Sequence, residues 1–263
     1  MPEITTILPT YRRPRLLGRA IRSVLSQTVR DFVLLVLDNA SGDETSRVVE
    51  DVARGDSRVV YVCHPRNIGA PLNFRHGMSG VRTPFFSFLS DDDILLPTFY
   101  ETALAGFAAH PDAAFSATAV VHMDASGRVL FSPVFHWPEG RHAPPAGLFA
   151  MLRLYHPTWT GSLFRTSLVA SVGLLDMEAG MVADLDFQLR VAARFPFVVS
   201  RTPGAVFMAT ASSESAQHVL RNTWPCWLRM IANLERDPCL TPAERRLAVR
   251  SLVGVGRLRK FLA

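Results

Sequence analysis

The sequence predicts an α/β fold with a mostly parallel central sheet. Strand-like apolar runs occur at residues 4–9, 32–37, 59–63 and 85–89. The segments between these runs place apolar residues at helical spacing, as residues 16–25 illustrate. Strands that alternate with helices are typical of a parallel sheet covered by helices. The hydrophobic content of 48% over 263 residues is enough for a substantial buried core.

Local signals place further elements along the chain. Ser41 and Glu44 have the S-x-x-E spacing of a capping box, which predicts that a helix begins there. A turn is expected around residues 124–127, where Asp-Ala-Ser-Gly separates two apolar runs and favours a hairpin. A helix is expected over residues 183–195, followed by two terminal helical segments.

The regular alternation fades after about residue 112, and this change predicts how the chain is organised. We expect residues 1–112 and 113–212 to be two halves of one domain and residues 213–263 to be a helical extension. The basic stretch at residues 245–260 has two interpretations. It is either a helix packed on its own domain, which we favour, or a peripheral contact to an anionic membrane or acidic carrier.

Composition excludes several classes of protein. The formal charge of +5 comes almost wholly from scattered arginines, without the clustered basic face of a nucleic-acid-binding protein. The cysteines Cys63, Cys226 and Cys239 are widely spaced and suggest neither a disulfide framework nor a zinc site. No signal-peptide pattern or membrane-spanning apolar run is present, so we expect a cytoplasmic protein without an integral membrane segment.

Three adjacent carboxylates, Asp91, Asp92 and Asp93, directly follow the strand-like run at 85–89. Ligands bind at the carboxyl ends of the strands in open α/β sheets, so chemistry is expected there. Adjacent carboxylates repel one another unless a cation is bound, and Mg²⁺ or Mn²⁺ takes oxygen ligands. The alternative is a solvated acidic loop or a helix N-terminus.

Four further motifs occur in order along the chain. They are P-T-Y-R-R-P at residues 9–14, A-I-R-S-V-L-S-Q-T at 20–28, L-D-N-A-S-G-D-E-T at 37–45 and N-I-G-A-P-L-N at 67–73. Together with the acidic triplet they resemble glycosyltransferase family 2 over roughly residues 4–215. The resemblance implies a GT-A-type nucleotide-binding sandwich and an inverting transfer of sugar from a nucleotide diphosphate donor.

The resemblance also implies roles for individual residues in donor binding. The residues implied to bind the nucleotide are Pro9, Thr10, Tyr11, Arg12, Asp38, Asn67, Asn73, Asp91 and Asp92. Asp38 can accept from a uracil imide and Tyr11 can cover the base, so a UDP-sugar is the expected donor. Asp93, with Asp91, is implied to ligate the divalent metal. The alternatives are a packed surface aromatic for Tyr11 and a turn cap for Asp38.

A second acidic motif follows in the latter half of the chain. Residues 183–190 read A-D-L-D-F-Q-L-R and match the family pattern E-D-x-D-(L/F)-x-L-R, in a register anchored by Gly173 and Asp176. The resemblance assigns Asp184 as the general base. Ala183 stands where the family has glutamate, which predicts a less elevated base pKa. The family histidine is expected near Thr210, and His218 lies further along.

Aromatic residues between the hairpin and the base helix suggest an acceptor pocket. His156, Trp159 and Trp137 combine rings with polar edges that suit a sugar or an aglycone, although large aromatics are also common in cores. The expected acceptor is a small molecule or a carrier-bound group. The sequence leaves both a monomer and a homodimer as options.

Two alternative functions are weighed against transfer. Ala183 in place of an acid is the argument for a homologue that binds a nucleotide sugar without turning it over. A sugar nucleotidyltransferase would need a glycine-rich loop at residues 9–14, where no glycine is present. A dinucleotide-dependent dehydrogenase is disfavoured because no G-x-G-x-x-G follows an early strand.

Overall fold

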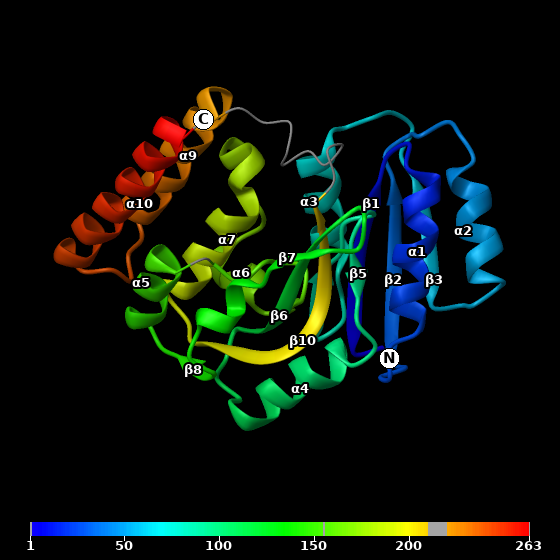
Figure 1. The fold of residues 1–263 in the computed structure, drawn as a ribbon, viewed down its shortest axis with the longest axis horizontal. Coiled ribbons are helices and arrows are strands. Elements are labelled where there is room, and N and C mark those ends of the chain that lie inside the picture. The colour runs from blue at the N-terminus through cyan, green and yellow to red at the C-terminus, as the bar shows by residue number, and fades with distance from the viewer. Residues whose placement is uncertain (1, 155, 210–219, 263) are drawn as a thin grey trace.

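The computed structural model describes residues 2–154, 156–209 and 220–262, and it shows an α/β protein built on one ten-stranded sheet (Figure 1). The strands are β1 (Ile4–Thr10), β2 (Phe32–Asp38), β3 (Val59–Cys63), β4 (Phe85–Phe88), β5 (Ile94–Leu95), β6 (Phe115–Asp124), β7 (Val129–Phe131), β8 (Gly140–His142), β9 (Ser162–Arg165) and β10 (Phe197–Ala209). The predicted fold class is confirmed.

Helices follow most of the strands. The α-helices are α1 (Pro14–Leu25), α2 (Thr45–Ala53), α3 (Ala70–Gly80), α4 (Phe99–Ala109), α5 (Ala146–Arg153), α6 (Leu168–Val172), α7 (Ala183–Ala192), α9 (Leu220–Glu235) and α10 (Pro242–Leu262). Two 3₁₀ segments are η1 (Pro133–His136) and η2 (Met177–Val182).

The sheet has the order β3-β2-β1-β4-β9-β6-β10-β5, with β7 added beside β6 and β8 beside β10. Strands β3, β2, β1 and β4 are parallel, and Thr10 at the end of β1 pairs with Asp38 at the end of β2. The carboxyl ends of these strands therefore lie at one edge of the sheet, which gathers the polar segments that follow them.

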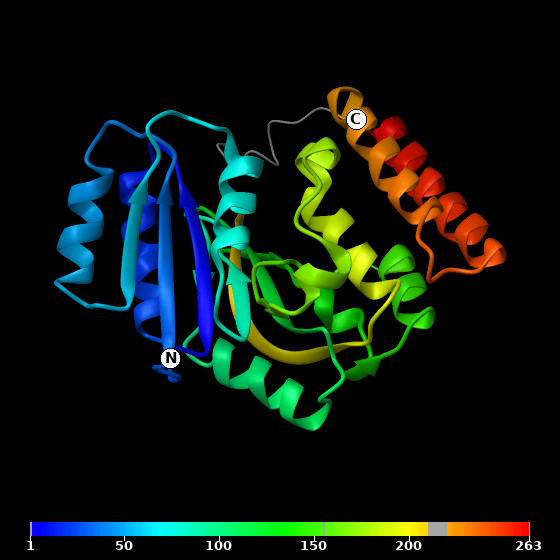
Figure 2. The same cartoon turned by 180° about the vertical axis from the view of Figure 1, so that it is seen from behind.

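Side chains alternate between two cores on opposite faces of the sheet. In β1, Ile4 and Leu8 pack in the core beneath α1, α2 and α4, whereas Ile7 packs in the core beneath α3, α7 and α9. Successive strand residues point to opposite faces, so a fully apolar strand serves both layers. The two views in Figures 1 and 2 show helices on both faces of the sheet.

Helix α3 approaches β1 more closely than a side chain would permit. A Cβ atom added at Gly77 would lie 2.4 Å from Ile7 Cγ2 and 2.7 Å from Leu37 Cδ1. Glycine at this position lets the helix lie directly on the sheet beside the carboxyl ends of β1 and β2.

The two C-terminal helices pack on the protein itself. Helices α9 and α10 lie side by side at one end of the molecule (Figures 1 and 2), and Ala248 and Leu252 of α10 are buried in the same core as Phe187 of α7. This arrangement agrees with the packing interpretation of the basic stretch. Among the described residues, none of the helices combines the length and apolar character needed to span a bilayer.

Two of the local predictions are corrected by the structure. The capping box at Ser41 does not form, because α2 begins at Thr45 and the Ser41 hydroxyl donates to Asp38. The helix expected over 183–195 ends at Ala192. The hairpin is confirmed, since β6 ends at Asp124 and β7 follows it in antiparallel pairing.

Candidate active site

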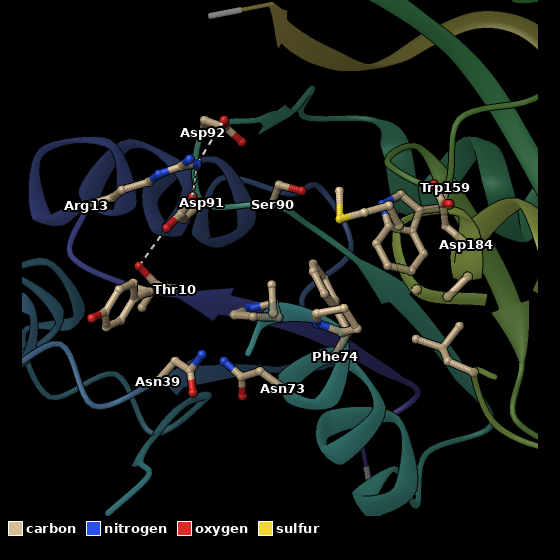
Figure 3. Close-up of a pocket in the computed structure, with 18 of the residues that line it drawn as sticks. Thr10, Arg13, Asn39, Asn73, Phe74, Ser90, Asp91, Asp92, Trp159 and Asp184 are labelled. Atoms are coloured by element: carbon tan, nitrogen blue, oxygen red, sulfur yellow. Dashed lines mark hydrogen bonds and ion pairs between the residues drawn. The ribbon is translucent and has the colours of Figure 1, made fainter. Parts of the chain in front are cut away.

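A cavity of about 340 Å³ lies at the carboxyl ends of β1 and β4 (Figure 3). One wall comes from the first half of the chain and consists of Pro9, Thr10, Tyr11, Arg13, Asn39, Ala70, Pro71, Asn73, Phe74, Ser90, Asp91 and Asp92. The other wall consists of Trp159, Leu175, Gly180, Met181, Ala183, Asp184 and Phe207. The motifs at the strand ends and the acidic motif of α7 therefore meet in one pocket.

A carboxylate pair and an arginine form the polar end of the first wall. Asp91 accepts a hydrogen bond from the Thr10 hydroxyl at 2.8 Å and pairs with the Arg13 guanidinium at 3.1 Å. The same Arg13 nitrogen lies 3.1 Å from Asp92. Burial raises the pKa of Asp91 to about 6, against the opposing effects of Arg13 and Thr10. The pair therefore holds negative charge in a place where water is largely excluded.

The sequence predicted Arg12 for the nucleotide, but the structure places Arg13 in the pocket. Arg12 has a positive φ of 54°, its N–H donates to the Ser41 hydroxyl and its guanidinium lies over the Tyr11 ring at 5.1 Å. Arg12 thus connects the loop after β1 to Ser41 and does not line the pocket. Two adjacent arginines give no signal in the sequence of which one points inward, because the turn conformation decides it.

Asp38 takes the role of a turn cap. Its carboxylate accepts from the Ser41 N–H at 2.9 Å, the Ser41 hydroxyl at 2.5 Å and the Tyr61 hydroxyl at 2.6 Å, and it is 2% exposed. Asn39, the next residue, lines the pocket in its place. The geometry therefore disagrees with direct reading of a base by Asp38 and leaves that residue holding the loop.

Asparagine side chains connect the loops at the first wall of the pocket. Asn39 donates to the Asn67 side chain at 2.9 Å and accepts from the Ile68 N–H at 2.8 Å. Asn73 lines the pocket, is buried, and donates to the Leu37 carbonyl at 2.8 Å. Asn67 is exposed and lies behind Asn39, outside the pocket lining.

Asp93 is buried in the protein and does not belong to the pocket lining. It is 1% exposed, and its two oxygens accept from the Thr160 hydroxyl at 2.8 Å and the Met208 N–H at 2.9 Å. Burial, followed by the neighbouring charge of Asp92, raises the pKa of Asp93 to about 8. Asp93 is absent from the pocket lining, unlike Asp91 and Asp92, and its two oxygens join the turn after β4 to Thr160 and to Met208 of β10, so its role as a metal ligand stays a prediction.

Asp184 lies in the first turn of α7 and faces the pocket from the second wall. Burial raises the pKa of its carboxyl to about 6, and the charge of Asp186 adds a smaller rise. A carboxylate with this pKa is a suitable general base near neutral pH. With alanine at position 183, the pKa of Asp184 is therefore still raised, because burial supplies the elevation.

The three aromatic residues predicted for the acceptor have different positions. Trp159 lines the pocket and packs on Phe88 and Phe74, with ring centroids 4.4 and 4.6 Å away. Trp137 is fully buried and packs against Phe197, which contradicts its predicted place in the pocket. His156 is half-buried and does not belong to the pocket lining.

Several pocket residues were not anticipated from the sequence. They are Arg13, Asn39, Phe74, Ser90, Met181 and Phe207. Asn39 directly follows β2 and Ser90 lies two residues after β4, so their positions carried a usable signal. Phe74, Met181 and Phe207 read as ordinary core residues, and only the packing of three separate elements exposes them to the cavity. Thr210 and His218 lie outside the described residues.

The metal prediction is tested by the donors that reach the pocket. The described residues contain no cluster of three or more His, Cys, Asp or Glu side chains that could hold an ion by itself. Asp91 and Asp92 are the acidic side chains on the first wall. Magnesium is usually held by one or two carboxylates together with substrate phosphates, and this pair fits that requirement.

The chain is similar in sequence to known glycosyltransferases. The model of the family "Glycosyl transferase family 2" matches residues 5–170. A beta-1,3-glucosyltransferase of Campylobacter jejuni that acts on GalNAc(5)-diNAcBac-PP-undecaprenol is 34% identical over 113 residues, which cover 41% of this chain and 37% of that protein. An uncharacterized protein of Mycobacterium tuberculosis is 25% identical over 82% of this chain and 70% of its own. The chain thus spans about a third of the length of the Campylobacter enzyme.

Solved structures share the fold at low sequence identity. TarS of S. aureus in complex with UDP-GlcNAc superposes with a TM-score of 0.79 at 15% identity, over 95% of this chain and 71% of that one. The mannosyltransferase PcManGT of Pyrobaculum calidifontis, in complex with GDP-Man and Mn²⁺, has a TM-score of 0.62 at 12% identity and covers 98% of this chain and 72% of its own. Since the family model matches more than half of the chain, the protein belongs to glycosyl transferase family 2 and has a GT-A-type fold.

Proposed function

We propose that this glycosyltransferase moves a sugar from a UDP-sugar to a hydroxyl acceptor by a single displacement with inversion. The observation that carries the proposal is the pairing of two walls in one pocket, with Asp91 and Asp92 on one side and Asp184 on the other (Figure 3). The acidic pair suits the diphosphate end of a donor through a metal, and the half-buried Asp184 suits removal of the acceptor proton.

Asp91 and Asp92 are the residues we assign to a divalent metal, Mn²⁺ or Mg²⁺. When bound, such an ion neutralises the charge that develops on a departing diphosphate. Arg13 pairs with both carboxylates and places a further positive charge at the same end of the pocket. The mannosyltransferase with a similar fold was solved with GDP-Man and Mn²⁺, which supports a metal for this fold but not the identity of its base.

Uridine is the nucleoside we assign to the donor. Tyr11 and Asn39 line the nucleotide side of the pocket, and an asparagine amide can both donate to and accept from a uracil edge. The TarS complexes with UDP and UDP-GlcNAc support the same assignment. Because Asn39 lines the pocket and Asp38 does not, we place base recognition on Asn39 and assign Asp38 to holding the loop through Ser41 and Tyr61.

The acceptor is proposed to enter beside Trp159 and Met181, on the wall that carries Asp184. A small molecule or a carrier-bound group fits this description. The Campylobacter relative acts on an acceptor joined to undecaprenol by a diphosphate, which supports the carrier-bound form. The pocket would recognise only the end of the acceptor that enters it.

Donor binding is tested first. A thermal-shift panel of UDP, GDP and ADP, with and without Mn²⁺, should show the largest rise in Tm with UDP and Mn²⁺, because a ligand that binds only the folded protein stabilises it. Equal shifts for all three nucleotides would contradict the uridine assignment. Transfer from a UDP-sugar to a hydroxyl acceptor, followed by analysis of the anomeric configuration by NMR, then tests turnover and inversion.

The alternative of a binding protein without turnover rests on Ala183. The structure favours catalysis over this alternative, because Asp184 lines the pocket and its pKa is already raised by burial. Donor binding without transfer or hydrolysis of the UDP-sugar across a broad acceptor panel would support the non-catalytic alternative. The nucleotidyltransferase alternative predicts formation of a nucleotide sugar from a nucleoside triphosphate and a sugar phosphate.

A further inference from the structure

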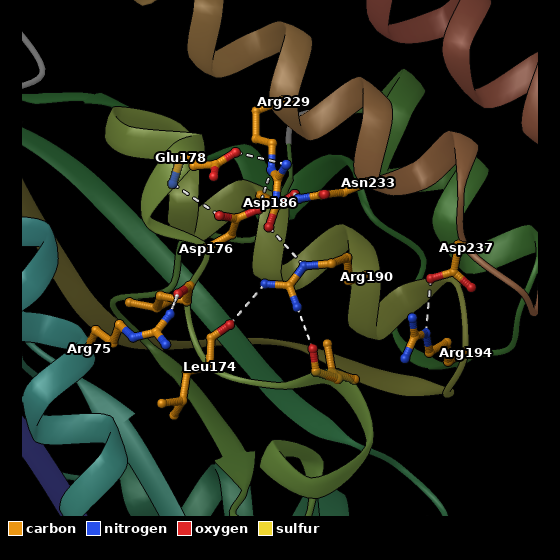
Figure 4. Close-up of polar contacts among 12 residues, drawn as sticks. Arg75, Leu174, Asp176, Glu178, Asp186, Arg190, Arg194, Arg229, Asn233 and Asp237 are labelled. Carbon is orange, nitrogen blue, oxygen red and sulfur yellow. Dashed lines mark hydrogen bonds and ion pairs between the residues drawn. The ribbon is translucent and has the colours of Figure 1, made fainter.

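Helix α9 lies behind the wall of the pocket that carries Asp184. Figure 4 shows a network of polar side chains in which α9 meets η2 and α7. The residues of η2 and the start of α7 include Gly180, Met181 and Asp184, all of which line the pocket. The position of this wall therefore depends on its contacts with α9.

Asn233 of α9 joins the two segments of the wall. Its side-chain nitrogen donates to Asp176 at 2.8 Å and to Asp186 at 2.9 Å. Asp176 precedes η2, and its other oxygen accepts from the Glu178 N–H at 3.0 Å. Asp186 is fully buried in α7, two positions beyond the proposed base. One amide thus uses both of its hydrogens to fix the beginning of η2 against the first turn of α7.

Arginines complete the network on either side of Asn233. Arg229, one turn earlier on α9, donates to Asp176 at 2.7 Å and pairs with Glu178 at 2.8 Å. Arg190 of α7 pairs with Asp186 at 2.8 Å and donates to the carbonyls of Val172 and Leu174. Every carboxylate of the network therefore has an arginine partner, and the amide of Asn233 links the two ion pairs.

The backbone of η2 at Gly180 also packs closely against α9. Gly180 has a φ of 48°, and a Cβ atom added there would lie 2.7 Å from the Sγ of Cys226 on α9. The pocket-lining turn therefore rests directly on the helix. A displacement of α9 would reach Gly180 and Asp184 without touching the nucleotide side of the pocket.

We infer that Asn233 and Arg229 are positioning residues, which hold η2 and α7 so that Asp184 faces the acceptor. The inference rests on the proposed role of Asp184 as the base. The inference gives helix α9 an indirect part in catalysis. Asn233 and Arg229 do not contact substrate, since both lie behind the pocket lining.

The test compares kcat, donor KM and Tm in variants of the full chain. Asn233→Leu keeps most of the side-chain volume but removes both donors, while Arg229 and Arg190 still pair with their carboxylates. We expect kcat to fall about tenfold or more, because a displacement of about 1 Å in a catalytic group is costly. Donor KM should stay within about twofold, since the nucleotide wall is untouched.

Asn233→Asp is the second variant, and it separates positioning from a general loss of stability. It keeps the shape of the side chain but places a third carboxylate against Asp176 and Asp186, with Glu178, Arg229 and Arg190 facing the same cluster. The ratio of its kcat to that of the wild type should rise as pH falls, because protonation within the cluster relieves the repulsion. Arg229→Lys should recover part of the kcat that Arg229→Ala loses.

Glu235→Ala, at an exposed position of the same helix, is the matched control and should leave kcat unchanged. A lower Tm in both Asn233 variants, with kcat per folded molecule equal to that of the wild type, would overturn the inference. Failure of the proposed function would give a different experimental result. In that case the wild type shows no transfer, or Asp184→Asn is fully active, whatever the Asn233 variants do.

Discussion

Burial determines the chemistry of the individual carboxylates in this protein. Asp184 and Asp93 are both aspartates at the margin of the site, and burial raises the pKa of the first to about 6 and of the second to about 8. Only Asp184 faces the cavity. The same physical effect therefore suits one residue to proton transfer and leaves the other as a buried structural group.

The pH dependence of turnover follows from the pKa of Asp184. The base acts in its deprotonated form, so kcat with a hydroxyl acceptor should rise with pH through about 6 and level off above it. Asp184→Asn should lower kcat by roughly 10²–10⁴-fold while donor affinity is kept. The measurement is a pH–rate profile combined with UDP affinity, and a flat profile between pH 5 and 8 would show that the base lies elsewhere.

Asp92 and Asp93 provide a direct test of the metal assignment. Asp92 lines the pocket, whereas both oxygens of Asp93 accept hydrogen bonds from the protein. Asp92→Asn should therefore abolish most of the Mn²⁺-dependent increase in UDP affinity, and Asp93→Asn should retain it. Calorimetric titration with and without Mn²⁺ distinguishes them, and the reverse pattern would restore Asp93 as the metal ligand.

Asp93 should also affect stability as pH changes. Its folded pKa of about 8 lies above the ordinary aspartate value of 3.8, so the folded state keeps a proton that the unfolded state has lost. The stability contributed by this group is present below about pH 4 and is lost as pH rises to about 8. Asp93→Asn removes this dependence, so its Tm relative to the wild type should be higher at pH 8 than at pH 5.

At the scale of elements, the close contact of α3 with the sheet shapes one wall of the pocket. Phe74 and Asn73 of α3 both line the cavity, and Gly77 lets the helix approach Ile7 and Leu37. The sequence predicted the helix but gave no measure of its distance from the sheet. That distance depends on residues of β1 and β2, which are far from position 77 along the chain.

Two glycines of α3 form a matched pair for testing this contact. Gly77→Ala should destabilise the protein by about 1–3 kcal/mol, because its added methyl group meets a packed core. Gly80→Ala, which meets nothing within 4 Å, should be neutral or slightly stabilising. Urea unfolding of the two variants gives the comparison, and equal stabilities would mean that α3 shifts without cost.

At the scale of the whole molecule, the C-terminal helices are part of the main core. Leu252 of α10 is 2% exposed, whereas Leu247 on the same helix is 52% exposed. Leu252→Ala should therefore lower the free energy of unfolding by about 2–5 kcal/mol, and Leu247→Ala should change it little. A similar effect of both substitutions would indicate that α10 does not pack in this way.

The sequence by itself determined the α/β class, the order of the first strands, the hairpin, and the segments that meet at the site. These features depend on periodicity and on motifs that are local in the chain, and parallel strands bring their carboxyl ends together whatever the details of packing. Asp91 and Asp92 could be assigned to the site for that reason, whereas Asp184 was assigned through the family resemblance of residues 183–190.

Only the tertiary structure decided which side chain of each motif points into the cavity. Arg13 lines it rather than Arg12, Asn39 lines it rather than Asp38, and Asp93 is buried outside the lining with Met208 as a partner. Neighbouring residues of one loop differ in direction because of backbone torsions and of partners such as Ser41 and Met208 from distant segments. The attachment of α9 to the base helix through Asn233 has the same origin, since no local pattern records a contact between elements that meet only after folding.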